Sequence, residues 1–311
     1  MARLLDRLGV ATRTLVLAAW FAAVVLPMLW VVGTSLKSTR EIYANPFGPP
    51  RALIAPSAGT LAAAKANFAK AWVGSHFGDY FANSVVVVAI SLAGILLLGS
   101  MAAYALARFE FRGRAFLQTV FVSGLLIPMQ LILIPLFFQF ADMSEALTRV
   151  LAPVAKALGM GTLVVQLHDS HAGIVLIYIA ASLPFTVFTL TAFFRTLPGA
   201  VREAAMLDGA SETRTFFSVM LPLARPGLVT VAIFNFLGLW NEYLFGMVFL
   251  SSDRLKTLPL GLAGISMQAQ YKSDFGLLFA GLVIAMLPTL AVYLALQEQL
   301  TKGITAGAIK G

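Results

Sequence analysis

Polar side chains that are costly to place in a lipid environment interrupt a strongly apolar stretch near residue 240. Asn235, Asn241 and Glu242 can hydrogen-bond a polar solute, and Trp240 and Tyr243 offer ring faces on which a solute can stack. Asn235 and Asn241 are six residues apart, so both can line one pore only if the helix bends. Structural roles are equally expected for all five, including anchoring of the two aromatic rings at a membrane interface.

A second group of reactive residue types, His168, Asp169 and His171, has the donor atoms of a metal site. Three candidate ligands in one loop, with no fourth and no helical spacing, are more typical of a solvated loop than of a closed metal site. The chain has no cysteine, which excludes disulfides, thiolate catalysis and cysteine metal sites. It also lacks the patterns G-x-x-x-x-G-K-[ST], H-E-x-x-H and G-x-S-x-G. We therefore predict no metal site, no catalytic residue and no ATP binding on this chain.

The segment 197–226 predicts two short helices that meet at a turn. Pro198 suits a first helical turn, and Gly209 suits a position that needs a left-handed backbone. Ser211 can cap the second helix, with Glu212 placed favourably at its positive end.

The two short helices differ in the kind of side chains that line one face. The first presents small side chains on one face and the second an apolar stripe; the members are Val201, Ala204, Ala205 and Asp208, then Phe216, Phe217 and Met220. Packing on the protein's own bundle would explain the stripe. It would not explain Glu203 and Asp208 around two alanines, which suit close approach by a partner.

The composition predicts a membrane protein. Of the 311 residues 59% are apolar and 12% charged, with a mean hydropathy of +0.87, which exceeds what a soluble core uses. Six stretches reach the ~20 apolar residues that a helix needs to cross a bilayer: 14–36, 83–107, 115–140, 172–194, 227–250 and 276–296. Prolines within them, at 128, 135, 184 and 288, predict kinks rather than breaks. The predicted fold is an all-α integral membrane protein with six transmembrane helices.

The net charge of +8 lies in short clusters between the apolar runs, without the basic stripe typical of nucleic-acid binding. Arginines concentrate in two short connections, at 108–114 and 195–225, and by the positive-inside rule these face the cytoplasm together with both termini. The predicted organisation is a cytoplasmic N-terminus (1–13), a permease domain (14–300) and a cytoplasmic tail (301–311). Within the domain lie the cytoplasmic hairpin 197–226 and an external insert, 141–171.

Small residues recur every fourth position in the second predicted span, at Gly99, Ala103 and Ala107. Such a face lets two helix backbones approach closely. Packing within the chain is the favoured interpretation.

The hairpin resembles the EAA loop of ABC importer permeases. The residues that carry this resemblance are Glu203-Ala204-Ala205, Asp208-Gly209 and Leu221-Pro222. In that family the loop is a coupling helix that docks into a cleft on the nucleotide-binding subunit. The resemblance implies that Glu203 and Ala204 lie at this contact, that Gly209 makes the turn, and that the hairpin passes nucleotide-driven closure to the spans.

Other motifs resemble the maltose-type branch of carbohydrate permeases: Asn83-Ser84, residues 103–109, Trp240-Asn241-Glu242-Tyr243 and residues 303–311. The resemblance covers nearly the whole chain and implies sugar or oligosaccharide import across a bacterial-type inner membrane. It also implies a second homologous permease subunit, two ATP-binding subunits that use ATP and Mg, and an external solute-binding protein. No cofactor is expected on this chain.

The roles expected for the tail and for the solute contacts rest mainly on this resemblance. The tail, with Gly307, Lys310 and Gly311, is expected to reach the interface of the ATPase dimer. The partner permease can hold most of the solute contacts, so this chain either touches the solute or only shapes and gates its path. The insert 141–171 is predicted to form a helix at the membrane interface. This helix would serve either as a docking surface for the binding protein or as a cap on the bundle.

Three other classes of protein compete with this interpretation. A secondary transporter would show paired ionisable groups at mid-membrane and repeats, and neither is visible. A scaffold or channel would not need the hairpin. An amino-acid or peptide permease is separated from a sugar permease only by the motifs in the second and fifth spans and the tail.

Overall fold

The structure, a computed structural model, describes residues 2–159 and 163–308, with side chains over 9–159 and 163–299. Its regular structure is helical, and no strand occurs in those ranges. Five helices are long and apolar enough to cross a membrane, or six if the bent pair Glu212–Leu223 and Arg225–Trp240 forms one span. The all-α membrane fold predicted from the sequence is confirmed.

Four of the predicted spans correspond to single long helices: α1 (Ala2–Ser35), α5 (Phe77–Arg108), α8 (His171–Thr196) and α15 (Phe275–Ala308). Pro184 and Pro288 lie inside α8 and α15 without ending them. Neighbouring groups in a helix bundle can compensate for the backbone hydrogen bond that proline cannot donate. The prediction that these prolines do not break their helices is confirmed.

The third predicted span, 115–140, is broken, and the prediction that Pro128 only kinks it was wrong. Helix α6 (Arg114–Gly124) ends four residues before Pro128, which caps the start of α7 (Met129–Ala157). A proline disfavours helical backbone at the residue before it, so Ile127 stays outside both helices, in the turn between them. Pro135 lies inside α7, which continues to Ala157 through the first half of the segment 141–171.

The fifth predicted span, 227–250, was also wrong as a single helix. Helix α12 (Arg225–Trp240) ends at its residue 240, and α13 (Leu244–Phe249) begins after a three-residue turn. The carboxylate of Glu242 accepts hydrogen bonds from the backbone N–H groups of Phe245 (2.8 Å) and Gly246 (3.2 Å). Because a capped helix start satisfies N–H groups that a continuous helix would pair internally, Glu242 favours the break.

The pattern of contacts within the chain divides it into two compact units. The first is the described part of Met1–Gly78 with Gly261–Leu287, and the second is Asp79–Leu260 with the described part of Pro288–Gly311. The first unit contains the short helices α2 (Thr39–Ala44), α3 (Arg51–Ile54), α4 (Ala58–Ala69) and η1 (Lys70–Gly74), and most of α14 (Leu258–Lys272). Within it the Asn67 amide donates to the carbonyls of Ser35 (2.9 Å) and Lys37 (2.8 Å), which closes the turn after α1.

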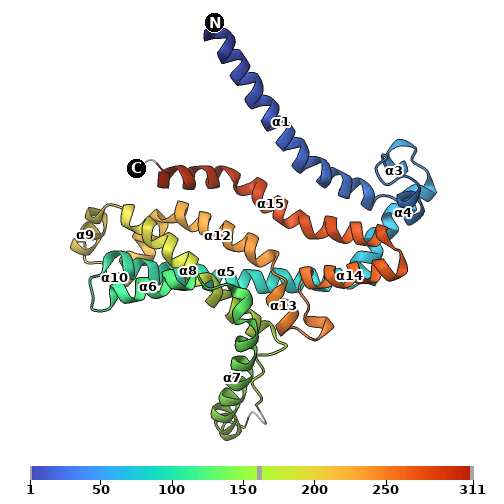
Figure 1. The fold of residues 1–311 in the computed structure, drawn as a ribbon. Helices are drawn as coiled ribbons and strands as arrows, with labels where there is room; N and C mark the ends of the chain where they lie inside the picture. Colours follow the sequence, from blue (N-terminus) through green and yellow to red (C-terminus); the bar gives the residue numbers. More distant parts are fainter. Residues whose placement is uncertain (1, 160–162, 309–311) are drawn as a thin grey trace. The chain divides into compact units, whose positions relative to one another are not determined.

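In the second unit α8 packs against both α6 and α12, while α13 packs against α7 and α8 (Figure 1). Asn83 and Ser84, near the start of α5, hold the segment around the 3-10 helix η3 (Asp253–Leu255). The Asn83 amide donates to the carbonyls of residues 254 (2.8 Å) and 256 (3.0 Å), and the Ser84 hydroxyl accepts from the N–H of Leu258 (2.8 Å). This sequence motif therefore has a structural role at one end of α5.

Gly99 of α5 lies close against α8. A Cβ atom at this position would lie 2.4 Å from the Cγ2 methyl of Thr186, and Ala103 one turn on is fully buried. The small-residue face is thus used for packing within the chain, as favoured from the sequence.

We expect Gly99→Ala to lower the free energy of unfolding of the purified chain by about 1–3 kcal/mol, the usual cost of overpacking, and so to lower its melting temperature. Thr186→Ser removes the clashing methyl and keeps the hydroxyl, so the double variant should recover most of the loss. Gly238→Ala, where nothing lies within 4 Å of the new methyl, is the control. Equal melting temperatures for Gly99→Ala and wild type would contradict this packing.

Candidate functional site

The segment 197–226 forms the predicted hairpin. Helix α9 (Gly199–Leu207) is followed by a turn, then by α10 (Glu212–Thr215), the π-helix η2 (Phe216–Met220) and α11 (Leu221–Leu223). Pro198 occupies the N-cap of α9, Gly209 has a φ of +83°, and the Ser211 hydroxyl accepts from the N–H of Arg214. The local prediction of two short helices and a left-handed glycine is confirmed.

An apolar cluster attaches the hairpin to α5 and α8. Phe216 and Met220 of η2 are buried together with Tyr104 of α5 and Phe194 of α8. The Tyr104 ring lies 5.1 Å from that of Phe216 and 5.5 Å from that of Phe194. Phe217, the third residue of the predicted stripe, is instead partly exposed.

Polar contacts fix the orientation of α9 on this cluster. Glu212 forms an ion pair with Arg202 of α9 and accepts a hydrogen bond from the Tyr104 hydroxyl (3.2 Å). The Arg202 guanidinium lies 5.4 Å from the centre of the Phe109 ring, in cation–π range. The hairpin is therefore held by charge, aromatic and apolar contacts at once.

Arg108 joins the end of α5 to the start of the hairpin. Its guanidinium donates to the carbonyls of Phe194 (2.8 Å) and Leu197 (2.6 Å), which lie at the end of α8. A cation is favourable there because helix C-termini carry partial negative charge. The turn after α5 and the hairpin after α8 consequently lie at the same end of the second unit.

The opposite side of α9 is open. Of the five residues predicted to form the contact, Glu203, Ala204, Asp208 and Gly209 are exposed and Ala205 is half-buried. The structure adds two residues that the sequence interpretation missed, Met206 and Leu207, which are 43% and 89% exposed. Two large apolar side chains next to the turn, on a helix of otherwise small or polar residues, were the available signal.

The five candidates for a solute path do not converge on one cavity. Asn235 is buried, and its amide donates to the Thr186 hydroxyl (3.0 Å) and the carbonyl of Val231 (2.9 Å). Trp240 is buried against Phe81 and Phe236. These two side chains join α12 to its neighbours.

The remaining three candidates surround the break between α12 and α13. The exposed Asn241 amide donates to the carbonyl of Leu237 (2.8 Å), and Tyr243 is half-buried. Glu242 accepts from the Tyr178 hydroxyl (2.8 Å) as well as capping α13. Helix α12 runs unbroken from Asn235 to Trp240, so the bend that the two asparagines need to share a face is absent, and the break begins only at Asn241.

The loop before α8 is tied to the loop after α13. The Asp169 carboxylate accepts from the N–H groups of Ser251 and Ser252 (both 2.8 Å) and from the Ser252 hydroxyl. Burial raises the pKa of Asp169, but these hydrogen bonds, first that from the Ser252 hydroxyl, outweigh it and leave the pKa below its usual value. His168 and His171 donate to the carbonyls of Phe137 (2.7 Å) and Leu255 (3.1 Å). In the described residues no three metal-ligand side chains come together.

The C-terminal candidates lie at the edge of what the structure describes. Gly307 belongs to the last turns of α15, whereas Lys310 and Gly311 lie outside the described residues.

Several helices long and apolar enough to cross a membrane, with a firmly attached hairpin between two of them, define a multi-pass membrane protein. Residues 95–306 match the family described as binding-protein-dependent transport system inner membrane component. The chain belongs to this family, and it is a permease subunit of a transport system that works with a binding protein and an ATPase.

Relatives match over most of their length. The chain is 40% identical to the diacetylchitobiose uptake system permease protein NgcG of Streptomyces coelicolor, over 98% of this chain and 90% of that protein. It is 31% identical to the trehalose transport system permease protein SugB of Mycobacterium tuberculosis, over 92% of each. It is 30% identical to the melibiose/raffinose/stachyose import permease protein MelC of Bacillus subtilis, over 79% of this chain and 80% of that protein.

We expect Gly209→Val to impair transport strongly, because a β-branched residue fits a left-handed turn poorly and such strain costs about 1–3 kcal/mol. No atom lies within 4 Å of the position of a Cβ, so the cause would be backbone strain rather than a clash. Asparagine tolerates the left-handed region, and Gly209→Asn should transport nearly as wild type. Uptake at matched expression tests the pair, and equal uptake by the valine variant would disprove the argument.

Proposed function

We propose that this chain is the permease half of an ATP-driven importer that passes a sugar or oligosaccharide delivered by an external solute-binding protein. The support for a carbohydrate is that relatives aligned over most of their length are named for diacetylchitobiose, trehalose and the melibiose group. The chain has no P-loop pattern. ATP and Mg would therefore be held by separate subunits, with no cofactor and no catalytic residue on this chain.

The observation that carries the mechanism is the exposed face of α9 on a firmly attached hairpin. Met206 and Leu207 project next to Glu203 and Asp208, with Ala204 between them. This combination suits insertion into a cleft with an apolar floor and a polar rim, because small residues allow close approach and Leu207 supplies an apolar anchor. We assign that cleft to the ATPase subunit.

The contacts below α9 supply the route by which a movement of the ATPase would reach the spans. A displacement of the hairpin pulls on α5 through Tyr104 and Arg108, and on α8 through Phe194 and Leu197. In our proposal closure of the ATPase pair moves the two hairpins of the transporter and switches the path between inward- and outward-facing states. The pair would be this chain and a second homologous permease, on two ATP-binding subunits.

The arrangement of the second unit supports a cytoplasmic hairpin. Arg108 and Leu197 join the turn after α5 to the hairpin, which brings the arginine-rich connections to one end, as the positive-inside rule requires. With an even number of spans both termini would share that side. The tail, with Gly307, Lys310 and Gly311, would then be able to reach the ATPase pair.

We propose two different roles along the solute path for the five candidate residues of the α12–α13 region. Asn241 and Tyr243, which retain exposed surface, are the residues of this set proposed to contact a solute. Asn235, Trp240 and Glu242 are proposed to shape the path by holding α12 and the break in place.

The test is co-expression of the chain with its neighbouring permease, ATPase and binding-protein genes. Glu203→Lys should abolish both co-purification of the ATPase and solute-stimulated ATP hydrolysis, whereas Glu145→Lys, an equal reversal of an exposed carboxylate on α7, should preserve co-purification of the ATPase. Unchanged coupling in Glu203→Lys would favour a self-contained secondary transporter. Stimulation by amino acids or peptides in place of disaccharides would overturn the carbohydrate assignment alone.

A further inference from the structure

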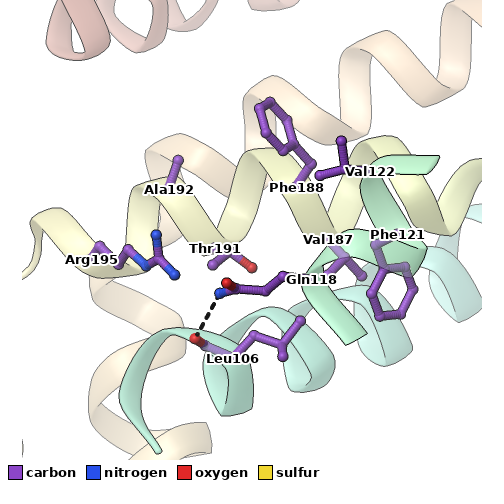
Figure 2. A pocket seen from close by; sticks show the side chains of 9 residues that line it. All are labelled: Leu106, Gln118, Phe121, Val122, Val187, Phe188, Thr191, Ala192 and Arg195. Atoms are coloured by element: carbon purple, nitrogen blue, oxygen red, sulfur yellow. Dashed lines mark hydrogen bonds between the residues drawn. The ribbon is translucent and has the colours of Figure 1, made fainter. Parts of the chain in front are cut away.

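The second unit contains a pocket of about 160 Å³ bounded by α5, α6 and α8, at the end where the hairpin begins (Figure 2). It is roughly five times the ~30 Å³ that one water molecule occupies in the liquid. The residues lining it are Leu106 of α5, Gln118, Phe121 and Val122 of α6, and Val187, Phe188, Thr191, Ala192 and Arg195 of α8. Neither the hairpin contacts nor the candidate solute path uses this pocket.

Polarity changes along the length of the pocket. Figure 2 shows Arg195, Thr191 and Gln118 toward one end, and Phe121, Val122 and Phe188 toward the other. Arg195 lies in the last turn of α8, and Phe188 lies seven residues earlier, or about 10 Å deeper along the helix. The pocket is therefore cationic at the end of the span and apolar toward its middle, which is the polarity order of a lipid molecule in one leaflet.

The polar end has unused hydrogen-bonding capacity. Thr191 is only 7% exposed, and its hydroxyl has no hydrogen-bond partner in the structure. Arg195 makes no ion pair among the described residues, and no carboxylate lines the pocket. By contrast, its neighbours Arg108 and Arg114 are engaged with backbone carbonyls.

We propose that this pocket binds the headgroup of an anionic phospholipid. The phosphate would accept hydrogen bonds from the Arg195 guanidinium and the Thr191 hydroxyl, and the first methylenes of an acyl chain would lie against Val187 and Phe188. Phosphate suits a guanidinium because both groups can form paired, charge-assisted hydrogen bonds. Phe188 and Val122 are half-exposed on the apolar side, so the acyl chain leaves the pocket into the bilayer.

Other occupants fit the pocket less well. A sugar would leave the apolar half without polar partners, and free phosphate would use only the end at Arg195. A helix of a neighbouring subunit would need a carboxylate at one depth to pair with Arg195. The lipid satisfies the cation, the buried hydroxyl and the apolar wall with one molecule.

The transporter complex containing the full-length chain is purified in detergent with either dioleoyl phosphatidylglycerol or dioleoyl phosphatidylcholine, and retained lipid is counted by native mass spectrometry. Wild type should retain phosphatidylglycerol, not phosphatidylcholine, in the presence of excess inorganic phosphate. Arg195→Gln should reduce retention about fivefold, the effect of one cation at a membrane surface, and Ala192→Phe should reduce it by filling the pocket. Arg112→Gln, an exposed arginine of the neighbouring turn that does not line the pocket, should retain lipid as wild type.

Three results would overturn the proposal. One is equal retention of the two lipids by wild type. Another is equal loss in Arg195→Gln and Arg112→Gln, which would indicate a diffuse surface charge effect. The third is loss of the second permease from the complex in Ala192→Phe with lipid retention unchanged, which would make the pocket a subunit interface.

Discussion

Aspartate in place of Leu207 is expected to eliminate solute-stimulated ATP hydrolysis while the permease still folds. Leu207 is 89% exposed, so the substitution costs the isolated chain little. In the assembled transporter the leucine would be buried, and that burial contributes about 1.5–3 kcal/mol. An unpaired carboxylate in the same cleft costs still more. Because each 1.4 kcal/mol is a factor of ten, ATPase binding should weaken at least about 100-fold.

The control is Leu53→Asp, since Leu53 is also largely exposed but belongs to the first unit. Both variants should reach the membrane at wild-type levels and elute as folded protein. Only Leu207→Asp should lose the ATPase on purification. Retention of the ATPase with normal stimulation would show that α9 is not the contact, and would leave the carbohydrate assignment untouched.

The long helices could be predicted from the sequence because hydrophobic length alone decides them. Predicted spans 83–107 and 172–194 fall inside α5 (Phe77–Arg108) and α8 (His171–Thr196). The polar residues that end the hydropathy signal still form helical turns, so the helices extend by one to six residues beyond the predicted bounds.

The broken spans could not be predicted by the same criterion. Hydropathy does not distinguish a kink from a break, and the deciding contacts are local and polar. At Pro128 the break follows from the backbone of the preceding residue, and at Glu242 from a carboxylate that caps a new helix. The sequence predicts a pathway role or a structural role for Glu242 without singling out capping, although an acidic residue close to a helix start is a capping signal.

In the hairpin, too, features set by neighbouring residues could be predicted, whereas contacts between distant residues could not. Its turn was predictable, because Gly209 and Ser211 act on their own backbone. Its attachment was not, because Tyr104 and Glu212 are 108 residues apart in the chain. A single sequence carries no signal for such a pair, so the surface of the site was predicted while the contacts that make it rigid were not.

Those contacts lead to the second large effect. Glu212→Ala is expected to uncouple ATP hydrolysis from transport even though Glu212 lies behind the exposed face of α9. The change removes the ion pair to Arg202 and the hydrogen bond from Tyr104, together about 1–3 kcal/mol for contacts of a charged, partly buried group. With α9 held only by the Arg202–Phe109 contact, the Arg108 hydrogen bond at Leu197 and the apolar packing at η2, movement of the ATPase would tilt the hairpin instead of pulling α5 and α8.

A double-mutant cycle measures this contact directly. Glu212→Ala and Arg202→Ala should each uncouple, and the double variant should be little worse than either, because both remove the same attachment. The matched pair is Glu145 and Arg149 on α7, an i,i+4 ion pair whose side chains are 71% and 76% exposed, which should contribute only about 0.3–0.5 kcal/mol. If uptake per ATP is normal in Glu212→Ala, apolar packing of Phe216 and Met220 is sufficient to transmit the movement, and the polar contacts only orient α9.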